Sequence, residues 1–285
     1  MKPSSPSLRE LVARASRTLG DAGVATPDVD ARLLAASLLD VPPLHLFFTD
    51  PPGDFPARYA AAVERRVRRE PLQHITGGAP FGPLDLRVGP GVFVPRPETE
   101  VLAQWAVDTL AGVRDPVVVD LGTGSGALAL YIAHARPDAR VTAVELSESA
   151  REYARENAAA HGASIRIVAG DMTDPGLLGE LSGSVDLVVA NPPYVPEDPG
   201  LDPEVYFDPA EAVFSGADGM AAIRGLVPVA ARLLAPGGAL GIEHDDTTSG
   251  EVCAVVAAEG SFREPEVLCD LTGRARFVTA GKLNG

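Results

Sequence analysis

The sequence predicts an α/β protein with a doubly wound, mostly parallel sheet of seven strands, preceded by a small all-helical region. Two regions of the chain with different patterns of apolar residues support this fold class. Residues 1–74 place their apolar residues at helical spacing, whereas short apolar runs alternate with helical segments from residue 96 onward. Apolar strands separated by helices are typical of a parallel sheet that helices cover on both faces.

The helical region is expected to contain three amphipathic helices. Ser7 and Glu10 form a capping-box pattern at the start of the first helix. Thr26 and Pro27 predict the N-cap and the first turn of the second. The third covers residues 57–70 and has a cluster of four arginines near its end. These are either a contact for an acidic partner or a solvated face near the helix C-terminus: Arg65, Arg66, Arg68 and Arg69.

The rest of the chain divides into a connector and the α/β domain. Residues 75–95 interleave glycines and prolines with short apolar stretches, which predicts a hairpin-rich connector. The α/β domain then covers residues 96–285. Its strands are expected at residues 116–121, 141–146, 165–169, 185–190, 239–243, 262–269 and 275–280. Ligands bind such sheets outside the carboxyl ends of the strands, so the loops after residues 121, 145, 170 and 190 should form one site.

Composition narrows the class of function. The net charge is −15, from 24 basic and 39 acidic residues, which argues against a direct nucleic-acid contact. The two cysteines, Cys253 and Cys269, lack metal-ligand spacing, so we expect no metal and a reduced, cytoplasmic protein. The first ten residues lack the apolar core of a signal peptide, and no apolar run approaches the length of a membrane span.

A glycine-rich turn, D-L-G-T-G-S-G at residues 120–126, joins the first strand to its helix. Glycines there let the backbone come close to a ligand, and the amides at the helix start face it. The spacing differs from G-x-G-x-x-G, so a dinucleotide pyrophosphate is disfavoured. Glu145, which ends the next strand, suits the hydroxyls of a ribose or is only a helix-capping neighbour. Asp171 and Met172 either border an adenine or form a plain turn.

The motif N-P-P-Y follows the strand at residues 185–190. Prolines stiffen the backbone, so the side-chain oxygen of Asn191 and the carbonyl of Pro192 become two fixed acceptors. A planar NH2 group fits this pair, and Tyr194 can stack on it and exclude water. Positioning and acceptor electrostatics would then carry the rate, without a general base. The alternative is a structural Asn-Pro turn.

These motifs together resemble the S-adenosylmethionine-dependent amino methyltransferases, and most closely the peptide chain release factor N5-glutamine methyltransferases (the PrmC/HemK family). Further stretches that match are P-L-Q-H-I-T-G (71–77), F-V-P-R-P-E-T-E (93–100), residues 118–161 and G-A-L-G-I-E-H (238–244). The similarity covers almost the full length and implies a Rossmann-like methyltransferase domain. Departures from the family pattern are Glu145 for aspartate, Met172 for an aromatic residue, and Ala275 for an acidic one.

The resemblance also implies roles for the site residues. S-adenosylmethionine would be converted to S-adenosylhomocysteine, and the substrate would be the glutamine of the Gly-Gly-Gln motif in class-1 release factors. The substrate glutamine would be bound by Asn191, Pro192, Pro193 and Tyr194, with Asn191, Pro192 and Tyr194 as the catalytic residues. The cofactor would be bound by Gly122, Thr123, Gly124, Ser125, Gly126, Glu145, Asp171, Met172 and Asn191. The helical region would recognise the protein substrate.

Other activities remain as alternatives. The same chemistry on a ribosomal protein glutamine is the nearest one. Adenine-N6 methylation of nucleic acid also uses N-P-P-Y, but the acidic charge counts against it. A nicotinamide dehydrogenase is disfavoured by the glycine spacing, and a non-catalytic cofactor-binding module would leave N-P-P-Y unexplained.

Overall fold

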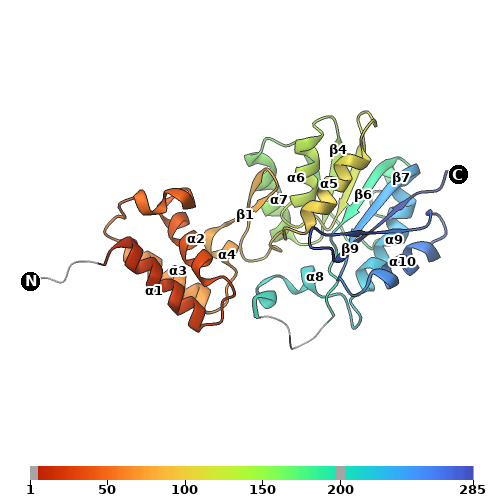
Figure 1. Cartoon of the computed structure of the whole chain (residues 1–285). Helices are drawn as coiled ribbons and strands as arrows, with labels where there is room; N and C mark the ends of the chain where they lie inside the picture. Colours follow the sequence, from red (N-terminus) through yellow and green to blue (C-terminus); the bar gives the residue numbers. More distant parts are fainter. Residues whose placement is uncertain (1–5, 197–199, 201–202, 285) are drawn as a thin grey trace, which may run out of the picture. The chain divides into compact units, whose positions relative to one another are not determined.

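The computed structural model describes residues 6–196, 200 and 203–284, which fold into two compact units (Figure 1). The helical unit contains the chain up to Gly78 and also the later segment Pro203–Phe207. The α/β unit begins at Ala79 and resumes at Asp208. Within the described residues, none of the helices combines the length and apolarity that crossing a membrane requires.

The helical unit packs its helices around one apolar core. Its elements are α1 (Leu8–Asp21), α2 (Pro27–Leu39), the 3-10 helix η1 (Pro43–Phe48), α3 (Phe55–Val67), α4 (Leu72–Thr76) and the 3-10 helix η3 (Pro203–Phe207). Fully buried Leu19, Leu34 and Phe55 lie in this core. The predicted capping box is confirmed, because Ser7 and Glu10 each accept a hydrogen bond from the other's backbone amide.

The four arginines around the end of α3 each pair with a carboxylate of the helical unit. Arg68 is exposed, as expected for a solvated face, whereas the others are at least partly buried. Arg66 is only 5% exposed. Its Nε donates to Asp30 over 2.7 Å, and its Nη2 donates to Glu204 over 2.8 Å. Arg69 also donates to Glu204. Thr26 occupies the N-cap position as predicted, but its hydroxyl donates to Asp30 instead of capping the helix.

The α/β unit contains a seven-stranded sheet in the order β5-β4-β3-β6-β7-β9-β8. Neighbours from β5 to β7 pair in parallel, and β9 pairs antiparallel with both β7 and β8. The predicted fold class is therefore confirmed. A separate hairpin, β1 (Gly78–Phe81) and β2 (Leu84–Arg87), precedes the sheet. The strands are β3 (Val117–Leu121), β4 (Arg140–Glu145), β5 (Ile165–Ala169), β6 (Val185–Ala190), β7 (Leu234–Glu243), β8 (Glu266–Cys269) and β9 (Ala275–Gly281).

Helices cover both faces of this sheet (Figure 1). One apolar core contains buried residues of α5 (Thr99–Thr109), α6 (Ala127–Ala135) and α7 (Glu148–Ala160). The opposite core contains residues of α9 (Ala221–Leu233) and α10 (Ser249–Ala258). The short elements η2 (Gly179–Leu181) and α8 (Ala210–Val213) lie in the connections. Helix α5 was not among the predicted elements, although it packs directly on the sheet.

Close packing of α5 on β7 depends on Gly241. A Cβ atom at this position would lie 2.5 Å from the ring of Trp105 and 2.8 Å from a methyl group of Leu102, so a larger residue would push the helix away. Two residues further along β7 is Glu243, and the first residue of α5 is Thr99. The glycine therefore brings the start of the helix next to the carboxyl end of the strand.

Candidate active site

A pocket lies at the carboxyl ends of the parallel strands, where the sequence predicts it. The loops after β3, β4, β5 and β6 all contribute to it. Every residue predicted to bind cofactor or substrate lines this pocket except Gly126, which begins α6 behind the turn. Residues not predicted for the site also line it, among them Val92, Phe93, Thr99, Asp120, Leu146 and Glu211.

The glycine turn after β3 adopts a conformation that favours glycine. Gly122, Gly124 and Gly126 have φ values of 79°, 57° and 91°, all in the left-handed region. The Gly122 amide donates to the carbonyl of Val144, which holds the turn against β4. A Cβ atom at Gly122 would lie 2.7 Å from the terminal methyl of Met172, so the turn and Met172 form adjoining walls of the pocket.

The Glu145 carboxylate binds the glycine turn directly. Its Oε2 accepts from the Gly124 amide and its Oε1 from the Ser147 amide, both over 2.9 Å. A carboxylate has about four acceptor sites, so lone pairs remain for hydroxyl donors in the pocket. The capping interpretation holds in part, since Ser147 is the N-cap residue of α7. The Glu145 carboxylate can therefore accept from the amide at the start of α7 and still accept from hydroxyl groups in the pocket.

Two aspartates at the pocket differ in their environment. The exposed Asp171 forms a local turn in which its Oδ1 accepts from the amide and the hydroxyl of Thr173. Asp120 is fully buried, and its Oδ2 accepts from Thr123 and the Ala129 amide. Among the described residues, none donates to its Oδ1. Burial, opposed by these hydrogen bonds, raises the pKa of Asp120 to about 7.

The charges at the pocket are all of one sign. Within the described part of the chain, no lysine or arginine lines it. The acidic residues that do so are Asp120, Glu145, Asp171 and Glu211. Such a lining suits a cationic ligand and lacks the counter-charges that a pyrophosphate requires.

The N-P-P-Y motif directly follows β6 and is fixed at both ends. Asn191 Nδ2 donates to the Thr99 hydroxyl over 3.4 Å. After the motif, the Val195 amide donates to the carbonyl of Val213 over 3.0 Å. A Cβ atom at Gly219 would lie 2.3 Å from the carbonyl oxygen of Tyr194, so this glycine permits a close backbone contact. Among the described residues, none donates to Asn191 Oδ1 or to the carbonyl of Pro192.

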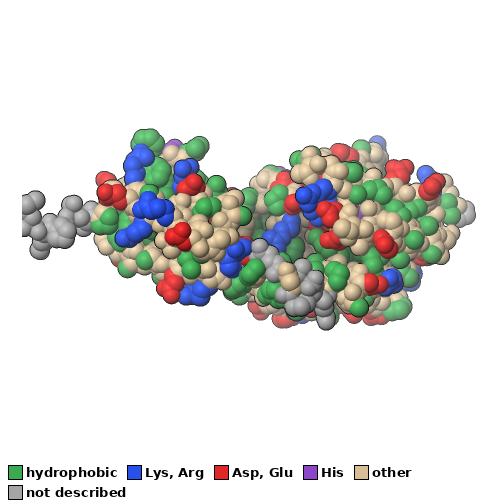
Figure 2. Space-filling view, turned by 60° about the horizontal axis from the view of Figure 1, so that its bottom comes forward, with side chains coloured by type: hydrophobic (Ala, Val, Ile, Leu, Met, Phe, Trp, Pro, Cys, Tyr) green, Lys and Arg blue, Asp and Glu red, His purple; other side chains and the backbone are tan. Residues whose placement is uncertain are grey.

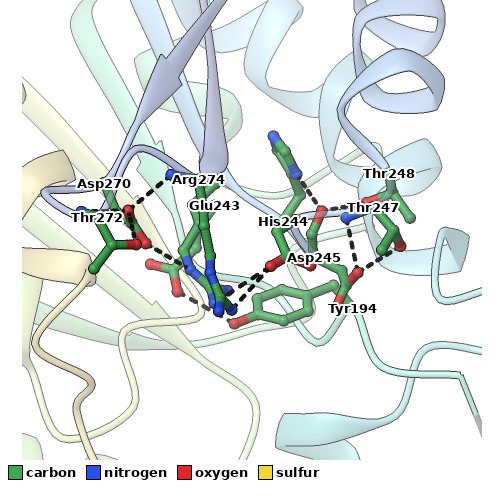
Figure 3. Close-up of polar contacts among 11 residues, drawn as sticks. Tyr194, Glu243, His244, Asp245, Thr247, Thr248, Asp270, Thr272 and Arg274 are labelled. Carbon is green, nitrogen blue, oxygen red and sulfur yellow. Dashed lines mark hydrogen bonds and ion pairs between the residues drawn. The ribbon is translucent and has the colours of Figure 1, made fainter.

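Behind the motif lies a buried carboxylate. Glu243, at the end of β7, is 1% exposed. Its Oε1 accepts from the Tyr194 hydroxyl over 3.2 Å (Figure 3), and its Oε2 accepts from the Thr99 hydroxyl over 2.7 Å. Burial raises the pKa of Glu243 to about 7, against the lowering effect of these two hydrogen bonds and of Arg276. Burial and the nearby Glu243 charge also raise the pKa of the Tyr194 phenol.

Arg276 is held beside this group by a second carboxylate. Its Nε donates to Asp270 over 3.0 Å. Asp270 also accepts from the hydroxyl and the amide of Thr272 and from the Arg274 amide, as the turn in Figure 3 shows. The Thr272 hydroxyl is the largest of the effects that lower the pKa of Asp270 to about 2. This turn fixes a positive charge near Glu243.

Sequence reasoning gave no role to Thr99 or Glu243. Both lie inside the stretches F-V-P-R-P-E-T-E and G-A-L-G-I-E-H that match the family pattern. The usable signal was a glutamate at the end of an otherwise apolar central strand, since an ionisable residue there needs partners.

The fold and this pocket define a methyltransferase of the Rossmann-like class. Residues 10–77 match the family PrmC N-terminal domain, and residues 84–202 match the family Methyltransferase small domain. A methyltransferase of known structure from Pyrococcus furiosus aligns with a TM-score of 0.54 at 20% identity, covering 77% of this chain and 98% of that one.

Full-length relatives then define the family. The release factor glutamine methyltransferase of Corynebacterium glutamicum is 59% identical over 97% of this chain and 99% of its own length. The enzyme of that name in Mycolicibacterium smegmatis is 54% identical, covering 97% of this chain and 98% of that one. This chain belongs to the release factor glutamine methyltransferases.

The raised pKa of Glu243 predicts a pH-dependent stability. Its pKa is about 7 in the folded protein against an ordinary value of 4.5, so the folded state binds the proton more tightly. The contribution of Glu243 to the free energy of unfolding is fully present below pH 4.5 and is lost as the pH rises through 7. We expect the wild type to lose on the order of 2 kcal/mol more than Glu243→Gln between pH 5.5 and 8.

Chemical denaturation at the two pH values measures this difference. Asp120 has a similarly raised pKa in both proteins, so its contribution cancels in the comparison. Parallel pH dependences of wild type and variant would show that Glu243 titrates normally.

Proposed function

We propose that this methyltransferase transfers a methyl group from S-adenosylmethionine to the side-chain nitrogen N5 of a glutamine, the one in the Gly-Gly-Gln motif of class-1 release factors. The observation that carries the proposal is a pair of acceptors in the lining of the pocket to which none of the described residues donates: Asn191 Oδ1 and the carbonyl of Pro192. An amide NH2 group has two N–H bonds and satisfies both acceptors.

The charge and the apolar residues of the pocket lining support S-adenosylmethionine as the cofactor. The carboxylates of the pocket suit a cationic sulfonium and ammonium better than a phosphate. Gly122, Gly124 and Met172 give the close backbone approach and the apolar wall that an adenosine requires. The lone pairs left on Glu145 suit the ribose hydroxyls. When bound, this cofactor supplies an electrophilic methyl group.

The protein's own part in the reaction is positioning. Hydrogen bonds from the substrate amide to Asn191 and Pro192 fix the plane of the amide and leave one face of its nitrogen open to the cofactor side of the pocket. Tyr194 covers the planar group and excludes water. The methylated nitrogen carries an extra proton and is acidic, so solvent can accept this proton after transfer. A general base is therefore not required.

The first prediction concerns the cofactor. Glu145→Ala removes the acceptors for the ribose hydroxyls and the contact that holds the glycine turn. We expect it to weaken cofactor binding by about 1.5–3 kcal/mol. Calorimetric titration with S-adenosylhomocysteine measures the effect. Glu152→Ala, an exposed position on the neighbouring helix α7, is the matched control. Equal affinities for the two variants would reject the assignment of Glu145.

The second prediction concerns the amide acceptor. Asn191→Ala should reduce the single-turnover rate of methyl transfer to a release factor by about 10²–10³-fold at saturating cofactor, because a well-placed transition-state partner is lost. Asn191→Asp keeps an oxygen and should retain an intermediate rate. Cofactor affinity should change less than the rate, and Asn284→Ala, on the exposed C-terminal segment, should match the wild type.

The same assay separates the candidate substrates. A wild-type rate for Asn191→Ala would make the motif a structural turn. Preferential methylation of a ribosomal protein or of DNA over a release factor would overturn the proposed substrate.

We also propose that the helical unit recognises the protein substrate. Two large apolar side chains of η1, Leu44 and Phe48, are 89% and 88% exposed. Hydrophobic side chains share the surface of this unit with arginines (Figure 2). Exposed apolar groups of this size are typical of a protein contact, since burying them against a partner is favourable.

The third prediction tests this contact. Leu44→Ser combined with Phe48→Ser should raise the KM for an intact release factor by about 10-fold and leave the cofactor affinity unchanged. Leu283→Ser, an exposed apolar residue of the α/β unit, is the control. Point substitutions suit this question better than deletion, because removing residues 1–74 would also strip Glu204 of Arg66 and Arg69. An unchanged KM in the double variant would exclude this surface.

A further inference from the structure

Both ends of the N-P-P-Y motif connect to the same buried carboxylate. Tyr194 contacts Glu243 directly, over 3.2 Å, and Asn191 contacts it through Thr99. The positions come from three separate parts of the chain: the start of α5, the loop after β6 and the end of β7. A stable core does not require a carboxylate at this place, since burying one is costly.

The hydrogen-bond polarity of this chain determines the orientation of Asn191. In its ionised form, which it takes as the pH rises above about 7, the Glu243 carboxylate carries no proton, so the hydroxyls of Thr99 and Tyr194 both donate to it. Each hydroxyl has only one proton. Thr99, having donated to Glu243 over 2.7 Å, can offer Asn191 only a lone pair. The NH2 end of Asn191 therefore faces Thr99, and its oxygen is left for the pocket.

We propose that Glu243 and Thr99 are positioning residues that fix the amide orientation of Asn191 and the ring of Tyr194 for the methyl-transfer reaction. The proposal rests on the proposed role of Asn191 as the acceptor of the substrate amide. With the amide reversed, Asn191 would present NH2 to the substrate NH2, and the two donors would repel one another. Glu243, acting through Thr99, thus determines that Asn191 presents its oxygen and not its NH2 group to the substrate.

Glu243 acts through its neighbours and not on the substrate. Thr99, Asn191 and Tyr194 line the pocket, whereas Glu243 is not among its lining residues. At 1% exposure its carboxylate lies behind the motif. The close packing at Gly241 keeps α5 in place, so the Thr99 hydroxyl stays within reach of both partners. The rigidity of this arrangement comes from the core of the domain.

Threonine substitutions test the relay. Thr99→Val keeps the shape of the side chain and removes its hydroxyl, and we expect the single-turnover rate to fall about 10²-fold from misorientation of Asn191. Thr99→Ser keeps the hydroxyl and should restore most of the rate. The affinity for S-adenosylhomocysteine should not change in either variant. Thr142→Val makes the same change at a buried position of β4 outside the pocket and should transfer methyl at the wild-type rate.

A double-mutant cycle tests Glu243 independently. In Glu243 the two hydroxyls donate to different oxygens, and Glu243→Gln replaces one of these with an NH2 group, so one hydroxyl loses its acceptor and the rate should also fall. Glu243 and Thr99 both act on the orientation of Asn191. The rate of the double variant, Glu243→Gln with Thr99→Val, should therefore fall no further than that of the slower single variant. Additive losses would overturn the proposal, as would a wild-type rate for Glu243→Gln.

The outcomes also separate this inference from the proposed function. If Asn191→Ala is slow while Thr99→Val transfers methyl at the wild-type rate, the positioning role is wrong and the proposed function stands. If Thr99→Ser is as slow as Thr99→Val, the hydroxyl is not what matters and the relay is wrong. If Asn191→Ala itself transfers methyl at the wild-type rate, both the positioning role and the proposed function of Asn191 are rejected.

Discussion

Parallel pairing of five neighbouring strands brings the loops after them to one edge of the sheet, and the site depends on this constraint. The glycine turn follows β3, Glu145 ends β4, Met172 follows β5, and the N-P-P-Y motif follows β6. Residues spread over about seventy positions of the chain thereby line one pocket. The adjacent β7 ends at the same edge and adds Glu243 behind the motif. The strand order therefore separates the residues proposed for the cofactor from those proposed for the substrate.

The carboxyl ends of these strands also concentrate buried acid. Asp120 and Glu243 are both inside the domain, and burial raises the pKa of each to about 7. Such groups weaken a fold at neutral pH, because ionising them in an apolar environment is unfavourable. Two apolar clusters, one on each face of the sheet, provide the stability that offsets the cost of these buried carboxylates. Both carboxylates lie at the candidate active site, Asp120 in its lining and Glu243 against Tyr194 and Thr99.

Local sequence patterns predicted the structural elements that residues close together in the sequence determine. Alternating apolar runs predicted all seven strands, and the glycine turn and Asn191 were recognisable because backbone conformation and motif spacing define them. Thr99 and Glu243 were not predicted, because their meaning lies in a contact between residues 144 positions apart. The partners of Arg66 were missed for the same reason, since Glu204 is 138 positions away. Helix α5 was overlooked although the local signal was present, because Leu102, Ala103 and Ala106 lie at helical spacing.

The segment Pro203–Phe207 limits how freely this architecture can be rearranged in evolution. It lies ten residues or so beyond the N-P-P-Y motif, yet it packs with the helical unit through Glu204. An N-terminal region transplanted onto another methyltransferase would leave the buried Arg66 without one of its two carboxylates. Recombination at the boundary between the units would thus separate a charge from its partner. The two parts of the gene that encode the helical unit should therefore be inherited together, although most of the catalytic domain lies between them.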